Sequence, residues 1–387
     1  MAEQTEASSS AAPSTPLSQL SEVTAHSTNR RRFLAEASAF ATFLAGCARS
    51  KPPVEKSDTA TAASGVATTA SGAPAHINQN PDSRTDTTLR HAMPASSGTP
   101  ATSNGASVAF HRIDPTLPPV SGNRTTKLHF TAKEVPVRVR EDTVVAAWTF
   151  EGDIPGPIVH VRQGDTVEFT LTNAGSIPHS MDFHAAKLDP KVAFRSVLPG
   201  QSLTFTYRPK YSGAFLYHCG TAPVLMHIGS GMFGAIIVDP LTPLRHAKEF
   251  VLVQSEFYLG PPQNGVAPFD YNKMLATLPD LFAFNGRPAQ YQSAPIRVKR
   301  GDLVRFYVVN AGPTHPCAFH IVGGQFDTVY LGAPPANAIH GVQTFDVAAG
   351  GGMIFEMQAD VPGEFVFVNH AFGHGQKGAI GVLIVEE

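Results

Sequence analysis

Apolar and polar residues alternate along short runs from Leu128 to the end of the chain. Residues 166–172 (TVEFTLT) and 202–207 (SLTFTY) are two such runs, and Gly, Pro and Asn separate them from their neighbours. A period of two with frequent turn residues is typical of half-buried β-strands. No long helical pattern competes with it, although residues 270–277 fit a short helix. The pattern therefore predicts an all-β fold of packed sheets.

A set of motifs occurs twice in this region, in the same order. Residues 157–169 resemble residues 295–306 once a one-residue gap is allowed. Internal repetition of this kind indicates two copies of one domain. We therefore expect two related β-sandwiches, at residues 121–246 and 247–387. The other matched pairs are His179-x4-His184 with His315-x4-His320, Ser212-Gly-Ala-Phe215 with Pro362-Gly-Glu-Phe365, and Gly234-Ala-Ile236 with Gly378-Ala-Ile380.

The first 120 residues have a different character. Residues 29–34 (NRRRFL) put paired arginines before a short apolar stretch that ends Leu-Ala-Gly-Cys47. Residues 1–47 are thus expected to be a twin-arginine, lipoprotein-type bacterial export signal with Cys47 lipidated. The alternative is a short buried helix with an ordinary cysteine. Residues 48–120 are rich in Ser, Thr, Ala and Pro and predict a flexible tether. The folded part would then be periplasmic or at the cell surface, anchored to a membrane.

Composition narrows the class of partner. Formal net charge is −2, and Asp, Glu, Lys and Arg make up 16% of the chain. That balance indicates neither a nucleic-acid-binding surface nor an acidic tail. The three cysteines, Cys47, Cys219 and Cys317, are odd in number, which argues against a disulfide framework. Each cysteine therefore needs its own explanation.

Four residues have the identity and spacing of one metal site: His179, Cys219, His227 and Met232. Two imidazoles, a thiolate and a thioether are the ligands of a blue-copper electron-transfer site, and the last three residues lie in one loop. Zinc is a second possibility, but it favours more thiolate or a carboxylate and has no use for the methionine. The remaining alternative is a buried free cysteine near unrelated histidines. The set predicts a type 1 copper site.

His218 directly precedes Cys219, and neighbours on a strand point to opposite faces. If Cys219 binds one copper, His218 can bind a second metal ion, and His184 would lie on the same face. Two histidines leave such a site open, so His370, near the end of the equivalent strand in the second copy, is the candidate third ligand. An all-histidine copper site with an open position can bind and reduce a small oxyanion. The bond between Cys219 and His218 would be a short covalent path between two metals.

Residues 177–186 (IPHSMDFHAA) and 217–234 resemble two-domain copper-containing nitrite reductases, and the short Cys–His loop resembles their lipoprotein subgroup. The resemblance spans residues 128–386 and implies two tandem cupredoxin-like Greek-key β-sandwich domains with two coppers per chain. It also implies nitrite as substrate and a small redox protein (cupredoxin or cytochrome c) as electron donor. The family is a homotrimer in which a neighbouring subunit supplies the second-domain ligand. The implied residues are His179, Cys219, His227 and Met232 for type 1 copper, His184, His218 and His370 for type 2 copper, and Asp182 and His320 as catalytic groups.

Two other functions remain open from the sequence alone. A two-domain laccase-like multicopper oxidase would need His-x-His pairs for a trinuclear copper cluster, and no two histidines of this chain are two residues apart. A non-catalytic electron carrier would explain the type 1 ligands but not His184, His218 and His370 together. Copper content separates a carrier, with one copper per chain, from the reductase, with two. The residues without a firm role are Cys317 as a small buried side chain, His315 as a remnant of the repeat, and His340 and His374 as packing groups or supports of the type 2 copper.

Overall fold

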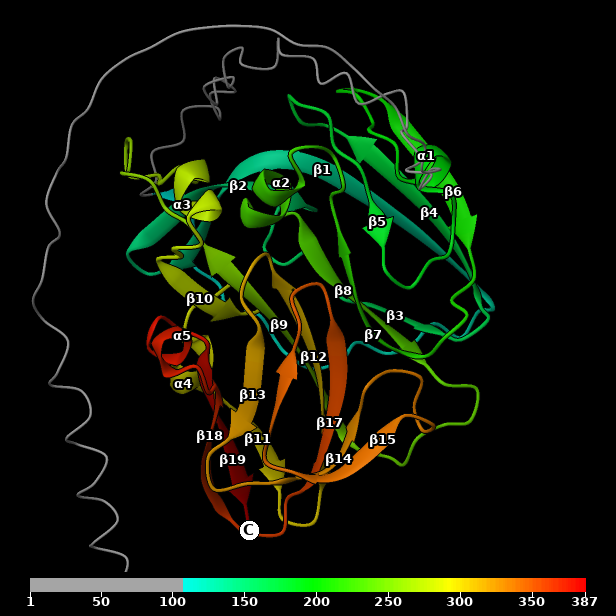
Figure 1. Ribbon diagram of the computed structural model, residues 1–387, viewed down its shortest axis with the longest axis vertical. Helices are drawn as coiled ribbons and strands as arrows, with labels where there is room; N and C mark the ends of the chain where they lie inside the picture. Colours follow the sequence, from blue (N-terminus) through cyan, green and yellow to red (C-terminus); the bar gives the residue numbers. More distant parts are fainter. Residues whose placement is uncertain (1–106) are drawn as a thin grey trace, which may run out of the picture. The chain divides into compact units, whose positions relative to one another are not determined.

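The computed structural model describes residues 107–387. These residues form two β-sandwiches, one from residues 125–239 and the other from residues 248–386 (Figure 1). The expected export signal, the lipidated Cys47 and residues 48–106 of the expected tether lie outside the described residues. Among residues 107–387, no helix combines the length and the apolar character needed to cross a bilayer. The all-β class predicted from the alternating pattern is confirmed.

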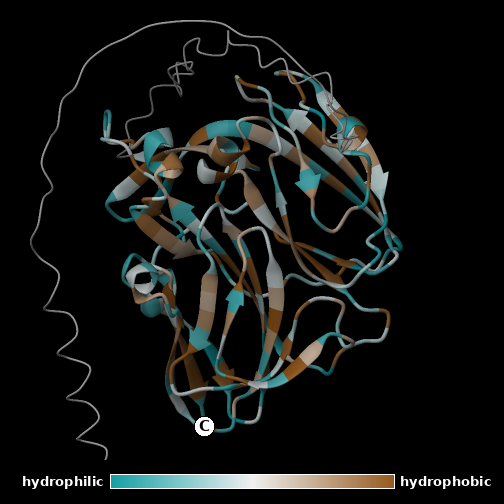
Figure 2. Ribbon diagram, viewed as in Figure 1, coloured by the Kyte–Doolittle hydropathy of each residue, from teal (hydrophilic) through white to brown (hydrophobic). Residues whose placement is uncertain are grey.

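The strands of the first sandwich are, in chain order, β1 (Thr125–Arg140), β2 (Thr143–Phe150), β3 (Val159–Arg162), β4 (Thr166–Asn173), β5 (Asp182–Phe183), β6 (Ser202–Tyr207), β7 (Gly213–His218) and β8 (Phe233–Asp239). They form two four-stranded sheets, with strand orders β2-β1-β4-β6 and β3-β8-β7-β5. In β4 every second residue is buried, so one face of the strand packs inward. Figure 2 shows this alternation as apolar and polar bands along the strands. Phe130, Phe169 and Phe183 belong to the core between the two sheets.

The strands of the second sandwich are β9 (Lys248–Phe257), β10 (Leu281–Phe284), β11 (Ala294–Lys299), β12 (Leu303–Gly312), β13 (Cys317–Ile321), β14 (Phe326–Tyr330), β15 (Ala338–Val342), β16 (Thr344–Val347), β17 (Gly352–Gln358), β18 (Gly363–Asn369) and β19 (Ile380–Glu386). They form a six-stranded sheet, β10-β9-β12-β17-β14-β15, and a five-stranded sheet, β11-β19-β18-β13-β16. All ten residues of β12 are buried. Both faces of this strand are therefore covered by other parts of the protein.

Strand β12 has an apolar cluster on each face, and one of these clusters is shared by the two sandwiches. Phe306 and Val308 pack inside the second sandwich, whereas Tyr307 and Val309 belong to a cluster that contains Leu216 of β7. Successive residues of a strand point to opposite faces, which explains this division. The shared core holds β7, and the residues that follow it, in a fixed place against the second sandwich.

Five short helices lie within residues 107–387: α1 (Pro190–Ala193), α2 (Val224–Gly229), α3 (Tyr271–Leu275), α4 (Gln290–Ser293) and α5 (Phe372–Gln376). The helix expected near residues 270–277 is α3. It begins where the Asp270 side chain accepts a hydrogen bond from the Lys273 N–H. Helix α2 carries His227 and lies in the loop between β7 and β8.

Residues 113–117 pack on the second sandwich, although the sequence predicts a tether that continues to residue 120. The Ile113 N–H donates to Gln290 Oε1 at 2.8 Å, and the Leu117 N–H donates to the Glu249 carbonyl at 3.0 Å. The Leu117 side chain is only 8% exposed. One apolar side chain and backbone pairing with β9 thus hold a segment whose composition is otherwise that of a linker.

Strands β7 and β18 are the matching strands of the two copies, and each begins with a Gly-x-Phe motif. A Cβ atom on Gly234 would lie 2.3 Å from the ring of Tyr217, and one on Gly381 would lie 2.1 Å from the ring of Phe367. Only glycine fits beside either ring, so Gly381 is the counterpart of Gly234. The expected match of Gly234 with Gly378 is wrong by three residues.

Strand pairing also corrects the expected match between the histidines. Equal counts along β7 and β18 make Val368 the counterpart of His218. Strand β5 pairs Asp182 with His218, and β13 pairs His320 with Val368. The expected His-x4-His match is therefore wrong by two residues, because backbone pairing fixes strand register and residue type does not. The corrected pairs are Asp182 with His320 and His179 with Cys317, in place of His184 with His320 and His179 with His315.

Candidate metal centres

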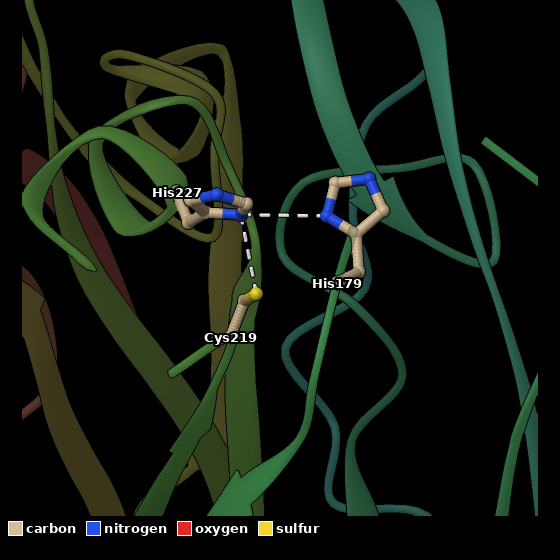
Figure 3. A group of neighbouring side chains, drawn as sticks. All are labelled: His179, Cys219 and His227. Carbon is tan, nitrogen blue, oxygen red and sulfur yellow. Dashed lines mark hydrogen bonds between the residues drawn. The ribbon is translucent and has the colours of Figure 1, made fainter. Parts of the chain in front are cut away.

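Three donor atoms from separate parts of the first sandwich meet at one point (Figure 3). The Nδ1 atoms of His179 and His227 are 3.3 Å apart, and Cys219 Sγ is 3.2 Å from His227 Nδ1. All three side chains are buried. Two imidazole nitrogens and a sulfur this close can bind one metal ion together. The structure thus gathers three of the four residues expected to form the type 1 site.

The backbone fixes the loop that contains the fourth residue, Met232. Its N–H donates to the His227 carbonyl at 3.1 Å, and its carbonyl accepts from the Cys219 N–H at 3.0 Å. Met232 is itself fully buried. Cys219 directly follows β7, and His179 lies just before β5, where it bridges to Val197. The donors therefore sit at neighbouring strand ends, before any metal has to organise them.

An acidic side chain contacts His179 on the other edge of its ring. Glu134 Oε1 accepts from His179 Nε2 at 2.9 Å, and the Ser176 N–H donates to Glu134 Oε2 at 2.8 Å. Burial acts to raise the pKa of Glu134, but these hydrogen bonds keep that pKa below its usual value. With Nε2 protonated, His179 presents Nδ1 to the metal. Sequence reasoning missed Glu134, which lies on β1, far from His179 in the sequence.

The thiol of Cys219 is set up to ionise. Burial acts to raise its pKa, but hydrogen bonds with His179 and His227 lower that pKa well below its ordinary value. The Ser180 N–H also points at the sulfur, at 3.3 Å. Thiolate is the form of cysteine that binds metals. Trp148, which sequence reasoning also missed, lies edge-on to the His227 ring with the ring centroids 4.8 Å apart.

A second donor cluster contains the residue before Cys219. His184 Nε2 and His218 Nε2 are 3.0 Å apart, and an Asp182 oxygen lies within 4.8 Å of both. His184 Nδ1–H donates to the Gly350 carbonyl at 2.9 Å, and His218 Nδ1–H donates to the Cys219 carbonyl at 3.0 Å. A carbonyl can only accept, so these bonds leave both Nε2 atoms free for a metal. Burial and the neighbouring His218 lower the pKa of His184, which favours the neutral, metal-binding imidazole.

His370 and His320 lie together on the second sandwich. Their ring centroids are 5.1 Å apart, and His320 Nδ1–H donates to the Gln343 carbonyl at 2.7 Å. His370 is exposed. In the part of the chain that the structure describes, the cluster around His218 includes neither residue. Within residues 107–387, a single chain therefore gathers two of the three histidines expected at the type 2 site.

The residues left without a firm role lie outside both clusters in residues 107–387. Cys317 is fully buried, and burial raises the pKa of its thiol. His340 Nδ1 lies 3.2 Å from Thr328 Oγ1. His315 and His374 belong to a separate polar group in the second sandwich, with ring centroids 5.0 Å apart.

Comparisons with known proteins agree with this arrangement. Two family models, each described as multicopper oxidase, match residues 131–243 and 261–387. The paired sandwiches and the two donor clusters, together with these matches, define a two-domain copper protein of the cupredoxin class. The solved structure of the copper nitrite reductase from Nitrosomonas europaea matches with a TM-score of 0.64 at 36% identity, covering 68% of this chain and 94% of that chain.

Relatives in sequence give the family. The copper-containing nitrite reductase of Neisseria meningitidis serogroup A is 40% identical over 248 residues, which are 62% of this chain and 64% of that protein. The copper-containing nitrite reductase of Cereibacter sphaeroides is 30% identical over 279 residues, which are 65% of this chain and 74% of that protein. This chain belongs to the copper-containing nitrite reductase family, as its motifs predict. It spans just under two thirds of the length of the Neisseria relative.

Proposed function

We propose that this protein reduces nitrite to nitric oxide by single-electron transfer. Each nitrite takes up one electron and two protons and releases nitric oxide and water. The adjacency of His218 and Cys219 at the end of β7 carries the proposal. Their side chains belong to different donor clusters, so one peptide unit joins an electron-storing centre to a histidine-lined site for substrate.

Copper would supply one-electron chemistry and a Lewis-acidic position for nitrite. Type 1 copper would be bound by His179, Cys219, His227 and Met232. Type 2 copper would be bound by His184, His218 and His370. The chain provides the donors in place. The lowered pKa of the Cys219 thiol favours the thiolate, which is the form that binds metal. Carbonyl hydrogen bonds orient the rings of His184 and His218. The bond from Cys219 to His218 is the shortest route along the chain for an electron.

Asp182 and His320 are the proposed proton donors. The Asp182 carboxylate lies beside the paired Nε2 atoms of His184 and His218, where a nitrite oxygen would leave as water. The His320 Nδ1–H is fixed on the Gln343 carbonyl, which leaves its Nε2 to carry a second proton. A positioned acid of this kind contributes about 10²–10⁴-fold to a rate.

In this proposal a neighbouring subunit completes the type 2 site. His370 is exposed and lies beside His320, whereas the cluster around His218 contains only two histidines from residues 107–387. A homotrimer that sets each second sandwich against the first sandwich of the next subunit would bring the two groups together. The same arrangement would place His320 near Asp182.

Location and partners follow from the N-terminal pattern and from the chemistry. Residues 1–47 would direct twin-arginine export, and the lipid on Cys47 would anchor the protein to a bacterial membrane, in the periplasm or at the cell surface. The remainder of the segment up to about residue 106 would tether two cupredoxin domains, residues 121–246 and 247–387. A small redox protein, a cupredoxin or a cytochrome c, would donate the electrons.

An anaerobic nitrite assay on the copper-loaded full chain tests the proposal, with nitric oxide detection, copper analysis and a visible spectrum. We expect two coppers per chain, an intense thiolate-to-copper absorption band and nitric oxide formation. One copper per chain without nitric oxide would make the protein an electron carrier. Oxygen uptake with phenolic donors and extra copper would make it a laccase-like oxidase.

A further inference from the structure

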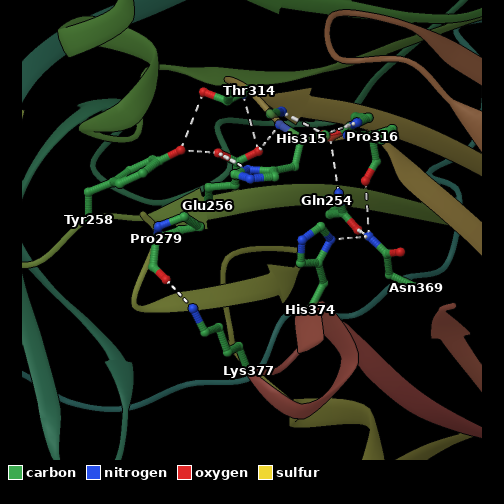
Figure 4. A network of polar contacts seen from close by, with 12 residues as sticks. Gln254, Glu256, Tyr258, Pro279, Thr314, His315, Pro316, Asn369, His374 and Lys377 are labelled. Carbon is green, nitrogen blue, oxygen red and sulfur yellow. Dashed lines mark hydrogen bonds and ion pairs between the residues drawn. The ribbon is translucent and has the colours of Figure 1, made fainter. Parts of the chain in front are cut away.

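The second sandwich contains a buried polar group outside the two donor clusters (Figure 4). Asn369, at the end of β18, is fully buried. Its Nδ2 lies 2.8 Å from Gln254 Oε1, 3.1 Å from the Pro316 carbonyl and 3.2 Å from His374 Nδ1. An amide with this many fixed partners has a defined structural role. The internal repeat identifies the counterpart of this amide in the first sandwich.

Asn369 occupies the place of Cys219. In the corrected register, His218 of β7 matches Val368 of β18. Cys219 directly follows the first of these residues, and Asn369 directly follows the second. The Ser180 N–H points at Cys219 Sγ from 3.3 Å, and the Ala318 N–H points at Asn369 Oδ1 from the same distance, 3.3 Å. The amide oxygen therefore stands where the first sandwich has its sulfur.

His374 occupies the place of His227. Cys219 Sγ lies 3.2 Å from His227 Nδ1, and Asn369 Nδ2 lies 3.2 Å from His374 Nδ1. The same contact thus exists in both sandwiches, with an amide nitrogen in one and a sulfur in the other. His374, which the sequence left without a firm role, is explained as the counterpart of a type 1 ligand.

The two loops also close in the same way. The Met232 N–H donates to the His227 carbonyl, and the Ala379 N–H donates to the His374 carbonyl, both at 3.1 Å. The Met232 carbonyl accepts from the Cys219 N–H, and the Ala379 carbonyl accepts from the Asn369 N–H, both at 3.0 Å. Ala379 is therefore the counterpart of Met232. The four corresponding pairs are His179 with Cys317, Cys219 with Asn369, His227 with His374, and Met232 with Ala379.

We propose that the second sandwich keeps the frame of a type 1 copper centre with its ligands replaced, and that Asn369 now positions His370. Asn369 Oδ1 accepts from the Ala318 N–H and from the Ala371 N–H, at 3.3 and 3.1 Å. The His370 N–H between them donates to the Ala318 carbonyl at 2.7 Å. The amide thus ties the residue after His370 to β13, which also accepts the His370 N–H. The positioning role of Asn369 rests on the proposed function, in which His370 is a ligand of the type 2 copper.

An amide suits this task better than the cysteine it replaces. A buried thiolate needs a metal or a cation as partner, whereas the neutral amide offers both donors and an acceptor. Its donors bind to Gln254 and Pro316 inside the sandwich, and its acceptor holds the loop that presents His370. Asn369 is therefore a positioning residue, since it acts on the metal only through the histidine that follows it.

The first experiment measures type 2 copper affinity in Asn369→Ser, with the type 1 absorption band as an internal check of the fold. We expect the affinity to fall about 10–100-fold, as for other residues that orient a ligand, and the electron paramagnetic resonance spectrum of the type 2 copper to change. Asn285→Ser, which removes another buried amide of this sandwich, should leave the affinity unchanged. Wild-type affinity and spectrum in Asn369→Ser would overturn the positioning role.

The second experiment tests the frame without reference to nitrite. On a Cys219→Ser background, Cys317→His, Asn369→Cys and Ala379→Met restore the four type 1 ligand types in the second sandwich. We expect copper(II) to produce a thiolate-to-copper band, and further substitution His374→Ala to remove it. The single change Asn369→Cys repeats the test if the triple variant does not fold. Folded protein without the band would refute the frame, whereas a wild-type protein with one copper per chain would refute only the proposed function.

Discussion

Replacing Glu134 with Gln should raise the reduction potential of the type 1 copper. The Glu134 carboxylate bonds to His179 Nε2 at 2.9 Å, and the opposite nitrogen of the same ring faces Cys219 and His227. A negative charge at this place favours copper(II) over copper(I), because the oxidised ion carries the larger positive charge. Gln has the same shape, but its single carbonyl oxygen can accept from either His179 Nε2–H or the Ser176 N–H, so the change removes the charge together with one of the two hydrogen bonds.

The size of the effect follows from the separation of the charges. The carboxylate would lie about 7 Å from a copper ion, since a metal binds imidazole nitrogen at about 2 Å on the far side of the ring. At an effective dielectric constant of about 20, two unit charges at about 7 Å interact with about 2.4 kcal/mol. Glu134 is 18% exposed, which reduces this value through solvent screening. The expected rise is about 50–100 mV, because about 59 mV corresponds to a tenfold change for one electron.

Redox titration of the thiolate-to-copper band gives the potential directly. Glu168→Gln is the matched control, since it removes a carboxylate that pairs with Lys127 on the outer side of the same sandwich. We expect the control to shift the potential by less than about 10 mV, in line with the weak action of exposed charges. Equal shifts in both variants, or an unchanged potential in Glu134→Gln with the band intact, would refute the reasoning.

Three further variants test separate parts of the molecule. Cys219→Ser should abolish the thiolate-to-copper band and remove one of the two coppers, which absorption and metal analysis would show. Asp182→Asn should lower nitrite turnover by about 10²–10⁴-fold while both coppers stay bound; full turnover would exclude a proton-donor role. Arg305→Met should lower the free energy of unfolding in urea by about 3–5 kcal/mol. Arg305 Nη2 pairs with Glu356 Oε1 at 2.6 Å, and both side chains are almost fully buried. Adding Glu356→Leu should recover part of that loss.

The sequence predicted what depends on residue identity and local spacing. The donors of the two centres were expected because few other purposes combine a cysteine, two histidines and a methionine in this order. Glu134 was not expected, since it reaches His179 only through the pairing of strands far apart in the chain. The packing of residues 113–117 was missed for the same reason. The two copies were aligned two residues out of register because both contain a His-x4-His motif. The two motifs have equal spacing, but they stand at different positions along the matched strands.

Asp182 and His320 occupy equivalent places in the two sandwiches, as the pairing of β5 with β7 and of β13 with β18 shows. A contact between the first sandwich of one subunit and the second sandwich of the next would therefore set these two groups on opposite sides of one site. Each site would then need Asp182 from one subunit and His320 from its neighbour.

Mixed trimers of Asp182→Asn and His320→Asn subunits test this dependence. Each parent variant lacks one group at every site, but a mixed trimer has some interfaces with both native residues. Closed symmetric oligomers use the same interface at each position, so one interface in three of every mixed trimer has both native residues, and the mixed trimers should show about a third of the wild-type turnover. Coexpression, purification with two different tags and a nitric oxide assay would measure the recovery. Activity no higher than the average of the two parents would place both groups in the same subunit's site, or show that only one of them moves a proton.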